Sequence, residues 1–525
     1  MKQMTNRIPR LWSVTLIALC WGALQSVAQD MAITVSIDRG KDVGQAFGSL
    51  FECASADGSV TVGAGFQNAY NTRYRADRHA VQFFVRPTDG SRSATVEELP
   101  RPTDDLTGAY LHGRDGVVYS TYGGLKSWNA GARRWDPATG PGGKEETMRV
   151  GDGTLGFGSS RVTWNGEVVL KPPAVGSYQL FFYTNGHLCF YHVNRGDKPY
   201  RPYVNDEDGF SRLFACPWKP SEGRVDLSKA IAFQLPIVGE TTFAWGTLGK
   251  QIVTGSNIGG FYVFEDGKWR MILEPVQGVS FQLYSSVAFH GRLLMGQYPT
   301  GRVFEYDGAK LVDREGWPPF MNGVSRRARE AQTTVVYGGE VMVGVWPWGE
   351  VWRYNPGGRR WRPARRMFRH PELSATITHP YDVENRNNAP RNQWGQRVTS
   401  LIPCGPDLFI STSAKSPQKW NAERFPFLAD GRWKSYGKVY RLNMPGHLAA
   451  PTRWTRGQTT LVFTVGSREM SIRQDGRLLA KSPFDEQLAA QLSRAGEFKD
   501  VQWGDGVYGE FGGVSLTGRI RTRGD

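Results

Sequence analysis

The sequence predicts an all-β protein, a seven-bladed β-propeller with a small β-rich appendage at its C-terminal end. The first observation is a repeat: residues 287–306, VAFHGRLLMGQYPTGRVFEY, return 48 residues later at 335–354 as VVYGGEVMVGVWPWGEVWRY. The second and third are short apolar strands and glycine turns that recur along most of the chain. Self-similarity at a period of about 40–50 residues, in units of short strands, is the signature of a propeller.

Each copy of the repeat contains four expected strands. The first two flank a turn at His290 and Gly291, the third covers 302–306 and the fourth covers 310–314. A four-stranded sheet cannot bury both faces alone, so such sheets are expected to stack side by side in a ring that hides their edges. In this arrangement the loops between the second and third strands share one face of the ring with the connections between blades.

Hairpins of the same kind set the expected number of blades. Asn-Gly and Asp-Gly between apolar runs are strong hairpin signals, because both turn residues need positive φ. The predicted hairpins turn at Gly58, Gly116, Gly186, Gly249, Gly291, Gly339 and Gly405. Seven hairpins predict seven blades, and a further strand pair at 161–170 makes eight blades the alternative.

Three segments are expected along the chain. Residues 1–28 combine a basic start, an apolar stretch of about 14 residues and a small-residue cleavage site ending at Ala28, which is the pattern of a secretory signal peptide. The protein is therefore expected to be secreted, either to a periplasm or outside the cell, and the apolar stretch is too short to span a membrane. Residues 29–450 are expected to form the propeller and residues 451–525 a C-terminal β-rich subdomain.

The C-terminal segment shows strand patterns at 460–465, 469–473 and 514–521 and a short helix at 485–495. Residues 471–480, SIRQDGRLLA, resemble a hairpin of laminin-G or concanavalin-like sandwiches. Such a sandwich needs about twice the length of this segment, which favours an appended subdomain. A strand at 32–37 is expected either to pack with this subdomain or to close the ring.

One part of the repeat resembles a known family. The segment VWRYNP at 351–356, followed by Trp361, resembles the second half of a Kelch-type repeat, and Gly338 and Gly339 resemble its paired glycines. The predicted fold is also similar to that of seven-bladed propeller polysaccharide lyases, which use His and Tyr. These resemblances imply the fold of the blades, whereas propellers as a class carry unrelated activities.

The charge balance indicates an acidic partner. The net charge is +15, and removal of the three basic residues in 1–28 leaves +12. A cationic exported protein favours an acidic polysaccharide or oligosaccharide as its partner. Nucleic acid is not expected, because no nucleic-acid recognition motif is present.

Four cysteines remain after removal of the signal segment. Export permits disulfides, and Cys189 and Cys216 are the best-placed pair because they lie on neighbouring predicted strands. The alternative is that all four are buried thiols. No Cys or His spacing predicts a metal site. Calcium at Asp206 and Asp208 is a weaker option, because the distant glutamate of a full calcium loop is missing.

The loops that share one face carry cations, amides and aromatic rings. Arg forks pair with carboxylate or sulfate, rings stack on sugars and amides bind hydroxyls. The expected substrate-binding residues are Arg73, Arg75, Asn257, Tyr298, Arg326, Arg329, Trp346, Trp348, Asn388, Arg391, Lys415 and Trp420. For each of them separately, packing between blades or solvation at the surface is the competing interpretation.

The long loop 379–397 is the sharpest candidate for catalysis. His379, Tyr381, Arg386 and Arg397 are its expected catalytic residues. In β-elimination on a uronic-acid polymer, Arg would neutralise the carboxylate, His would take the C5 proton and Tyr would protonate the leaving oxygen. Hydrolysis would instead need two carboxylates, drawn from Asp77, Glu330, Asp382, Glu384 and Glu423.

The sequence thus predicts a secreted carbohydrate-active propeller that acts on an acidic polysaccharide, by β-elimination or by glycoside hydrolysis. The alternative is a non-catalytic propeller that binds glycan or protein at the cell envelope. No organic cofactor is expected.

Overall fold

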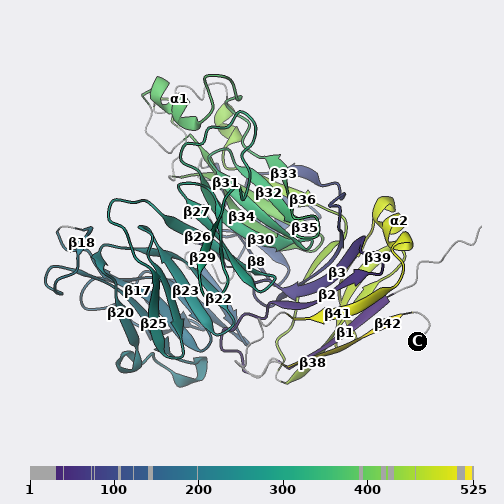
Figure 1. Cartoon of the computed structure of the whole chain (residues 1–525), viewed down its shortest axis with the longest axis horizontal. Helices are drawn as coiled ribbons and strands as arrows, with labels where there is room; N and C mark the ends of the chain where they lie inside the picture. Colours follow the sequence, from purple (N-terminus) through teal and green to yellow (C-terminus); the bar gives the residue numbers. More distant parts are fainter. Residues whose placement is uncertain are drawn as a thin grey trace, which may run out of the picture.

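A computed structural model describes residues 31–38, 41–71, 74–75, 77–104, 108–121, 123–139, 146–197, 199–388, 394–415, 421–423, 431–455, 457–504 and 515–522. The expected signal peptide and the candidate residues Arg73, Arg391 and Trp420 lie outside these ranges, and of Arg75 only the backbone is described. Figure 1 shows two bodies of β-sheet, one built from both ends of the chain and one from its middle.

A β-sandwich joins the two ends of the chain. Its first sheet consists, in spatial order, of β40 (Arg477–Pro483), β39 (Glu469–Gln474), β38 (Gln458–Val465), β1 (Met31–Asp38) and β42 (Ser515–Thr522). Its second sheet consists of β37 (His447–Pro451), β6 (Ala80–Pro87), β3 (Val60–Phe66), β2 (Ser49–Ser55) and β41 (Phe498–Trp503). Helix α2 (Glu486–Arg494) begins after Asp485, whose carboxylate accepts the Leu488 N–H.

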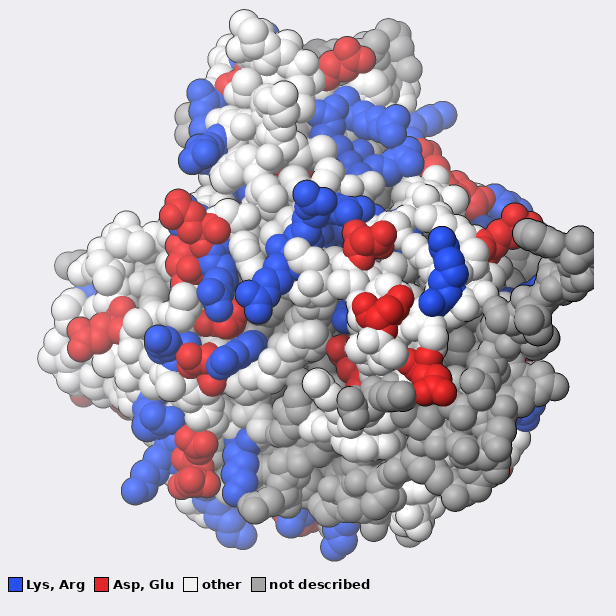
Figure 2. Space-filling view, turned by 45° about the vertical axis from the view of Figure 1, so that its right-hand side comes forward, with Lys and Arg blue, Asp and Glu red and all other residues white. Residues whose placement is uncertain are grey.

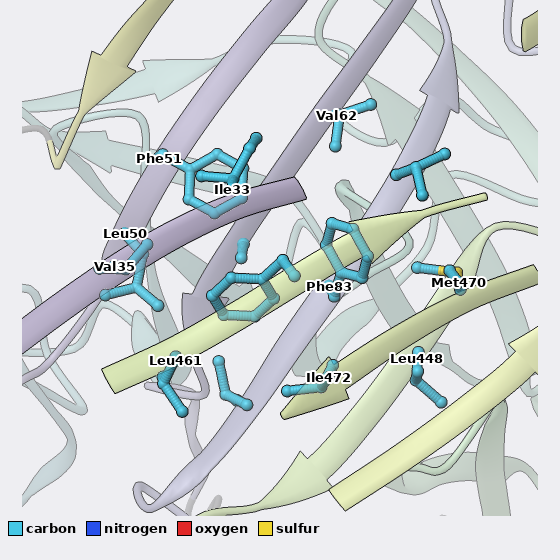
Figure 3. Close-up of a cluster of buried hydrophobic side chains, with 14 of the residues drawn as sticks. Ile33, Val35, Leu50, Phe51, Val62, Phe83, Leu448, Leu461, Met470 and Ile472 are labelled. Carbon is cyan, nitrogen blue, oxygen red and sulfur yellow. The ribbon is translucent and has the colours of Figure 1, made fainter. Parts of the chain in front are cut away.

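Alternating side chains of the two sheets fill the sandwich core, because successive residues of a strand face opposite sides. Ile33 and Val35 of β1 face Phe51 of β2 and Phe83 of β6, and all four are fully buried (Figure 3). The ring of Phe463 lies 5.4 Å from that of Phe51 and 5.2 Å from that of Phe83. The apolar alternation in sequence therefore becomes one core shared by strands more than 400 residues apart.

This topology corrects the expected segment boundaries. The hairpin that turns at Gly58 is β2–β3 of the sandwich and not a blade. Residues 451–525 are not an appendage of their own, because β1 pairs with β38 along its whole length and β2 pairs with β41. The sandwich reaches its full size because the missing half comes from the N-terminal end.

Seven antiparallel sheets, each built around four strands, make up most of the rest of the described chain. The first three are β8 (Leu111–Arg114), β9 (Val117–Ser120), β10 (Lys126–Asn129) and β11 (Arg134–Pro137); β12 (Glu146–Val150), β13 (Gly153–Gly158), β14 (Arg161–Trp164) and β15 (Glu167–Leu170); and β16 (Ser177–Thr184), β17 (His187–Asn194), β19 (Phe210–Pro217) and β20 (Ile231–Gln234). A small pair, β18 (Arg201–Pro202) and β21 (Ile237–Val238), lies beside the third.

The remaining four sheets contain the repeated segment. They are β22 (Thr242–Leu248), β23 (Gln251–Ser256), β24 (Phe261–Glu265) and β25 (Lys268–Leu273); β26 (Gln282–Phe289), β27 (Arg292–Tyr298), β28 (Val303–Tyr306) and β29 (Leu311–Arg314); β30 (Glu330–Tyr337), β31 (Glu340–Trp346), β32 (Glu350–Asn355) and β33 (Arg360–Arg366); and β34 (Gln396–Cys404), β35 (Asp407–Ala414), β36 (Val439–Asn443) and β7 (Thr95–Leu99). In the last sheet the outer strand comes from before β8 in the chain.

From β12–β15 onward, each sheet packs on the next in chain order through apolar side chains. One shared cluster joins the sheets of β26, β30 and β34 around Val343, Val398 and Leu401, and another joins the last sheet to the first through Ile402 and Leu111. The protein is therefore all-β with a propeller-like series of sheets. The sheet β12–β15 contains the strand pair expected at 161–170, whereas its first two strands had no counterpart in the sequence prediction.

A short hairpin that connects two strands of the sandwich inserts between the first strands of several propeller-like sheets. It consists of β4 (Tyr70–Asn71) and β5 (Tyr74–Arg75), and β4 pairs with β26. The hairpin also contacts β8, β12, β22 and β30. Asn71 is fully buried and donates from Nδ2 to the Gln332 carbonyl at 2.5 Å. Tyr70 and Asn71, which come just before the expected binding residues Arg73 and Arg75, are therefore part of the protein interior.

The cysteines favour the alternative of free thiols over a disulfide. Cys53, Cys189, Cys216 and Cys404 are free thiols. Leu188, not Cys189, lies opposite Cys216 in the ladder, so the two cysteines point to opposite faces of their sheet and belong to different apolar clusters. Within the described ranges, no helix is long and apolar enough to cross a membrane.

Candidate functional site

A buried carboxylate with two cations forms the centre of the candidate site. Glu330 opens β30, and its Oε2 lies 3.2 Å from Nζ of Lys415, which follows β35. Its Oε1 lies 3.3 Å from Nη2 of Arg397 on β34. The side chains are 0%, 14% and 8% exposed, respectively. One carboxylate meets two cations here, and the charge of the buried Glu384 also acts on Lys415, so two carboxylates oppose the two cations of this region.

Two aromatic rings border the same lysine. Nζ of Lys415 lies 4.1 Å from the ring centre of Trp346 and 4.7 Å from that of Tyr298, which is cation–π geometry. Burial lowers the pKa of Lys415, and the carboxylate of Glu330 opposes this shift. Burial and then the charge of Glu330 raise the pKa of Tyr298. We call Tyr298, Glu330, Trp346, Arg397 and Lys415 the central cluster.

The internal repeat explains how the rings reach this position. Tyr298 and Trp346 occupy the same place in the two copies, each at the end of the second strand and before a proline. Neighbouring sheets therefore present a ring at the same end, and Lys415 extends from the next sheet to meet them. Tyr381 adds a third ring, 5.9 Å from that of Trp346.

His379 is bound to the backbone through both ring nitrogens. It caps helix α1 (Pro380–Arg386), where Nδ1 accepts the Tyr381 N–H at 3.1 Å and Nε2 lies 2.9 Å from the Ala328 carbonyl. The side chain is fully buried, and burial lowers its pKa. A neutral imidazole that donates from Nε2 and accepts at Nδ1 satisfies both contacts. The expectation that His379 is the catalytic base is therefore wrong for this conformation.

The other residues of the expected catalytic loop divide between surface and interior. Arg386 is exposed and donates to the Thr376 carbonyl at 2.8 Å, and Asn388 is exposed at a positive φ of 49°. Glu384 is fully buried and accepts the Trp394 N–H at 2.9 Å. Figure 1 places α1 at the outer end of the molecule, well away from β8 and β22. Only Arg397 of the expected catalytic set belongs to the central cluster, with Tyr381 beside it.

Several expected sugar-binding residues have structural partners. Arg329 is 1% exposed, pairs with Glu350 at 2.9 Å and donates to the carbonyls of Pro318 and Pro319. Trp348 is buried in an apolar cluster with Phe368 and donates to the Thr378 carbonyl. These contacts contradict a binding role for Arg329 and Trp348, because neither side chain is exposed. Trp346 is also fully buried, so it contacts Lys415 but offers no exposed face to a ligand.

Two further candidates lie outside the central cluster. Asn257 follows β23 in another sheet, accepts the Thr241 N–H at 2.8 Å and donates to the Tyr200 hydroxyl at 3.3 Å. Arg326 is exposed and stacks over the Phe320 ring at 5.3 Å. The structure therefore brings together four expected residues, Tyr298, Trp346, Arg397 and Lys415.

Glu330 is the member of the central cluster that the sequence interpretation missed as a partner of these cations. The sequence offered it only as one of five carboxylates for hydrolysis. A usable signal was present, because Glu330 directly precedes the apolar first strand of a repeat and follows the unusually basic segment 326–329. A carboxylate at such a position needs a cation once the strand is buried.

The acidic candidates for calcium are already paired with arginines. Asp206 binds Arg212, and Asp208 lies 3.3 Å from Arg201. No cluster of three or more Asp, Glu, His or Cys side chains suitable for a metal ion occurs in the part of the chain that the structure describes.

A band of arginines runs along the outer strand β33 and the turns that flank it. It comprises Arg359, Arg360, Arg362, Arg365, Arg366 and Arg369, and residues 351–371 contain no acidic residue. None of the six forms an ion pair with a carboxylate among the described residues; Arg362, for example, donates to the carbonyls of Gly90 and Asp89 at 2.9 and 2.7 Å. Figure 2 shows Lys and Arg gathered just below the projection at the top of the molecule. We call these six residues the arginine strip.

The strip connects to the central cluster through the loop 346–348. The guanidinium of Arg366 lies 5.3 Å from the ring centre of Trp348, and Trp346 lies under Lys415. Cationic groups therefore extend from β33 to the end of β35 across neighbouring sheets.

The chain matches no protein-family model and no curated protein sequence. Among solved structures it is similar to the computationally designed Ika8 protein, with 12% identity and a TM-score of 0.34 over 72% of this chain and 97% of that one. It is also similar to YCF48 bound to D1 peptide, with 13% identity and a TM-score of 0.33 over 66% and 96% of the two chains. For the WD40 β-propeller domain of Doa1 the values are 10% and 0.33 over 66% and 95%.

Proposed function

We propose that this protein is a secreted seven-bladed propeller that binds an acidic polysaccharide. The arginine strip is the observation that carries the proposal, because six guanidinium groups that form no ion pair within the described ranges lie along one strand and its flanking turns. Arg forks pair with carboxylate and sulfate groups, and a linear polyanion can meet several of them at once. Closure of the sheet series into a ring is part of the proposal, supported by β7 as the last strand of the last sheet and by the contact of β34 with β8.

The central cluster supports the same ligand class, because its groups suit a single sugar unit that carries a carboxylate. The guanidinium of Arg397 and the amine of Lys415 suit a carboxylate, and Tyr298 and Tyr381 offer partly exposed rings for stacking. A competing role for the strip is structural, because charges on an edge strand prevent pairing with other chains. A binding role predicts that a polyanion binds to the strip, whereas a purely structural role does not, so binding measurements distinguish the two roles.

The test compares matched triple variants of the mature protein on immobilised polygalacturonate. The strip variant replaces the exposed Arg359, Arg360 and Arg369 by Gln, and the control replaces the exposed Arg195, Arg224 and Arg468. Both lose three charges, so a general charge effect weakens them equally. The proposal expects at least about a tenfold greater loss for the strip variant. Equal loss in both variants, or no retention of the unaltered protein, would contradict it.

Cleavage by β-elimination is the second candidate, favoured by the environment of Lys415. Burial moves the pKa of this amine toward neutrality, Arg397 could compensate a uronate carboxylate, and a tyrosine could protonate the leaving oxygen. The C5 proton would pass to the amine as the C4–O bond breaks and the C4=C5 bond forms. Incubation with polygalacturonate, followed by absorbance of the unsaturated product, tests this step. A binding-competent protein that yields no such absorbance is a binder only.

A further inference from the structure

A cavity separates the sandwich from the propeller-like body on the side of the hairpin turns. Its volume is about 60 Å³, and its mouth is open to solvent. The second sheet of the sandwich forms one wall, and the ends of β26 and β30 form the other. Ligand sites occur preferentially at such interfaces between domains.

Most of the cavity wall is apolar or aromatic. Phe66 and Phe84 line it from the sandwich, and Phe289 and Val336 line it from the other body. Aromatic walls favour a flat apolar ligand, because ring pairs gain stacking and edge contacts in addition to burial. A hydroxyl-rich sugar would leave its polar groups without partners there, so this site differs in kind from the central cluster.

One polar group in the wall lacks a partner. Gln82 of β6 is 6% exposed, and its Oε1 is buried without a hydrogen-bond partner among the described residues. An unsatisfied buried acceptor costs about 1–3 kcal/mol, so a ligand that reaches this amide gains affinity. The amide offers both an acceptor and a donor, which matches a hydroxyl group.

The charged groups at the mouth already satisfy one another. Nε2 of His290 lies 2.9 Å from Oε1 of Glu52, and Nη2 of Arg86 lies 3.6 Å from Oε2 of the same carboxylate. His290 is 44% exposed and stacks on Phe289 with the ring centres 4.1 Å apart. Since Glu52 has two partners, the described residues of the site offer no spare negative charge to a cationic ligand and no free cation to an anionic one.

Contacts on both sides hold the two walls at a fixed separation. Asn68 donates to the Ala288 carbonyl at 3.3 Å and accepts the Ala288 N–H at 3.0 Å. On the other side, Arg86 donates to the Gly339 carbonyl. The cavity is thus preformed, and a ligand would pay little to organise it.

We propose that this cavity binds a small neutral aromatic alcohol, with its ring between Phe84 and Phe289 and its hydroxyl on the amide of Gln82. The walls supply the apolar contact, the unpaired amide supplies the orientation, and the paired ions at the mouth exclude charged molecules. This site is independent of the proposed polysaccharide function.

Isothermal titration of the mature protein with 4-propylphenol and with its methyl ether tests the proposal. The phenol should bind saturably at one site, and the ether, which cannot donate, should bind at least about tenfold more weakly. Gln82→Leu should remove this difference while leaving the ether's affinity unchanged. Absence of saturable binding of the phenol up to its solubility limit would overturn the proposal.

A variant that fills the cavity tests whether the phenol binds there. Val336→Trp places a large ring in the cavity and should abolish phenol binding, whereas Val168→Trp, at a 38% exposed position of another sheet, should leave it intact. Binding that survives Val336→Trp would place the ligand elsewhere and reject the cavity. If Val336→Trp fails to fold, the Gln82→Leu comparison decides alone: a phenol preference that persists without this amide rejects the proposal.

Discussion

Nδ1 of His447 accepts the N–H of Gly338 at 3.0 Å, so a fully buried imidazole links the sandwich strand β37 to the turn between β30 and β31. The opposite nitrogen of His447 is buried without a partner in the described structure. Protonation of this ring would remove the acceptor and add a charge where none can be solvated. The contact between the two bodies therefore requires a neutral histidine.

Stability should fall on mild acidification. Burial lowers the pKa of His79 and of His112 from 6.5 to about 4, and that of His447 well below 6.5. Between pH 6.5 and about 4 the unfolded chain binds protons that the folded chain does not, so this stability is complete above pH 6.5 and is lost as pH falls toward 4. For His79 alone the loss is about 3 kcal/mol. Urea midpoints at pH 7, 5.5 and 4.5 measure it, and equal midpoints would contradict the account.

Gly339 should tolerate alanine poorly for a reason beyond its backbone. Its φ is +71°, and an added Cβ would lie 2.5 Å from the Phe84 ring. Gly58 is a matched control, with a φ of +69° and no atom within 4 Å of an added Cβ. Both substitutions incur backbone strain, so we expect Gly339→Ala to cost about 1–3 kcal/mol more than Gly58→Ala in urea unfolding. Equal costs would show that Phe84 moves freely.

The hairpin β4–β5 should contribute strongly to stability. Tyr70 is 2% exposed, its ring lies 5.4 Å from that of Phe182, and its hydroxyl donates to the Phe243 carbonyl at 3.3 Å. Tyr70→Ala should cost about 3–5 kcal/mol through the cavity it leaves. Tyr70→Phe, which removes only the hydroxyl, should cost about 1 kcal/mol. Similar small losses for both variants in urea unfolding would argue that the hairpin is not a packed part of the interior.

The thiols should be unreactive in the folded protein. Burial raises the pKa of Cys216 to about 12, that of Cys404 to about 11 and that of Cys189 well above 9.0. Since thiolates are the reactive form, a thiol reagent at neutral pH should label the native mature protein slowly and all four cysteines rapidly in denaturant. A labelling count of two after denaturation without reductant would reveal a disulfide and contradict the structure.

The fold could be predicted in its parts better than in its connections. Local signals such as the turns at Gly186, Gly291 and Gly339 place hairpins correctly because they depend on backbone conformation alone. The hairpin at Gly58 carries the same turn signal but pairs with β6 and β41. A local sequence pattern does not indicate which distant strand pairs with the edge of a hairpin. The entry of Tyr70 and Asn71 among the first strands was unpredictable for the same reason.

The candidate site shows a similar division. Tyr298 and Trp346 follow from the repeat, since equivalent positions of neighbouring sheets must lie at the same end. The role of His379 could not be read from its type, because a histidine before Pro380 can serve as a base or cap a helix, and only the contacts to Ala328 and Tyr381 decide. Glu330 became significant only when the fold placed it beside Arg397 and Lys415.

The salt dependence of binding to a size-defined oligogalacturonate tests the central claim most directly. With the mature protein, the account predicts an affinity that falls at least about tenfold between about 50 and 200 mM salt, because several ion pairs form with the arginine strip and the central cluster. The fall should become shallower when Arg359, Arg360 and Arg369 are replaced by Gln. An affinity that does not change with salt, or a slope that is the same in this variant, would contradict the account.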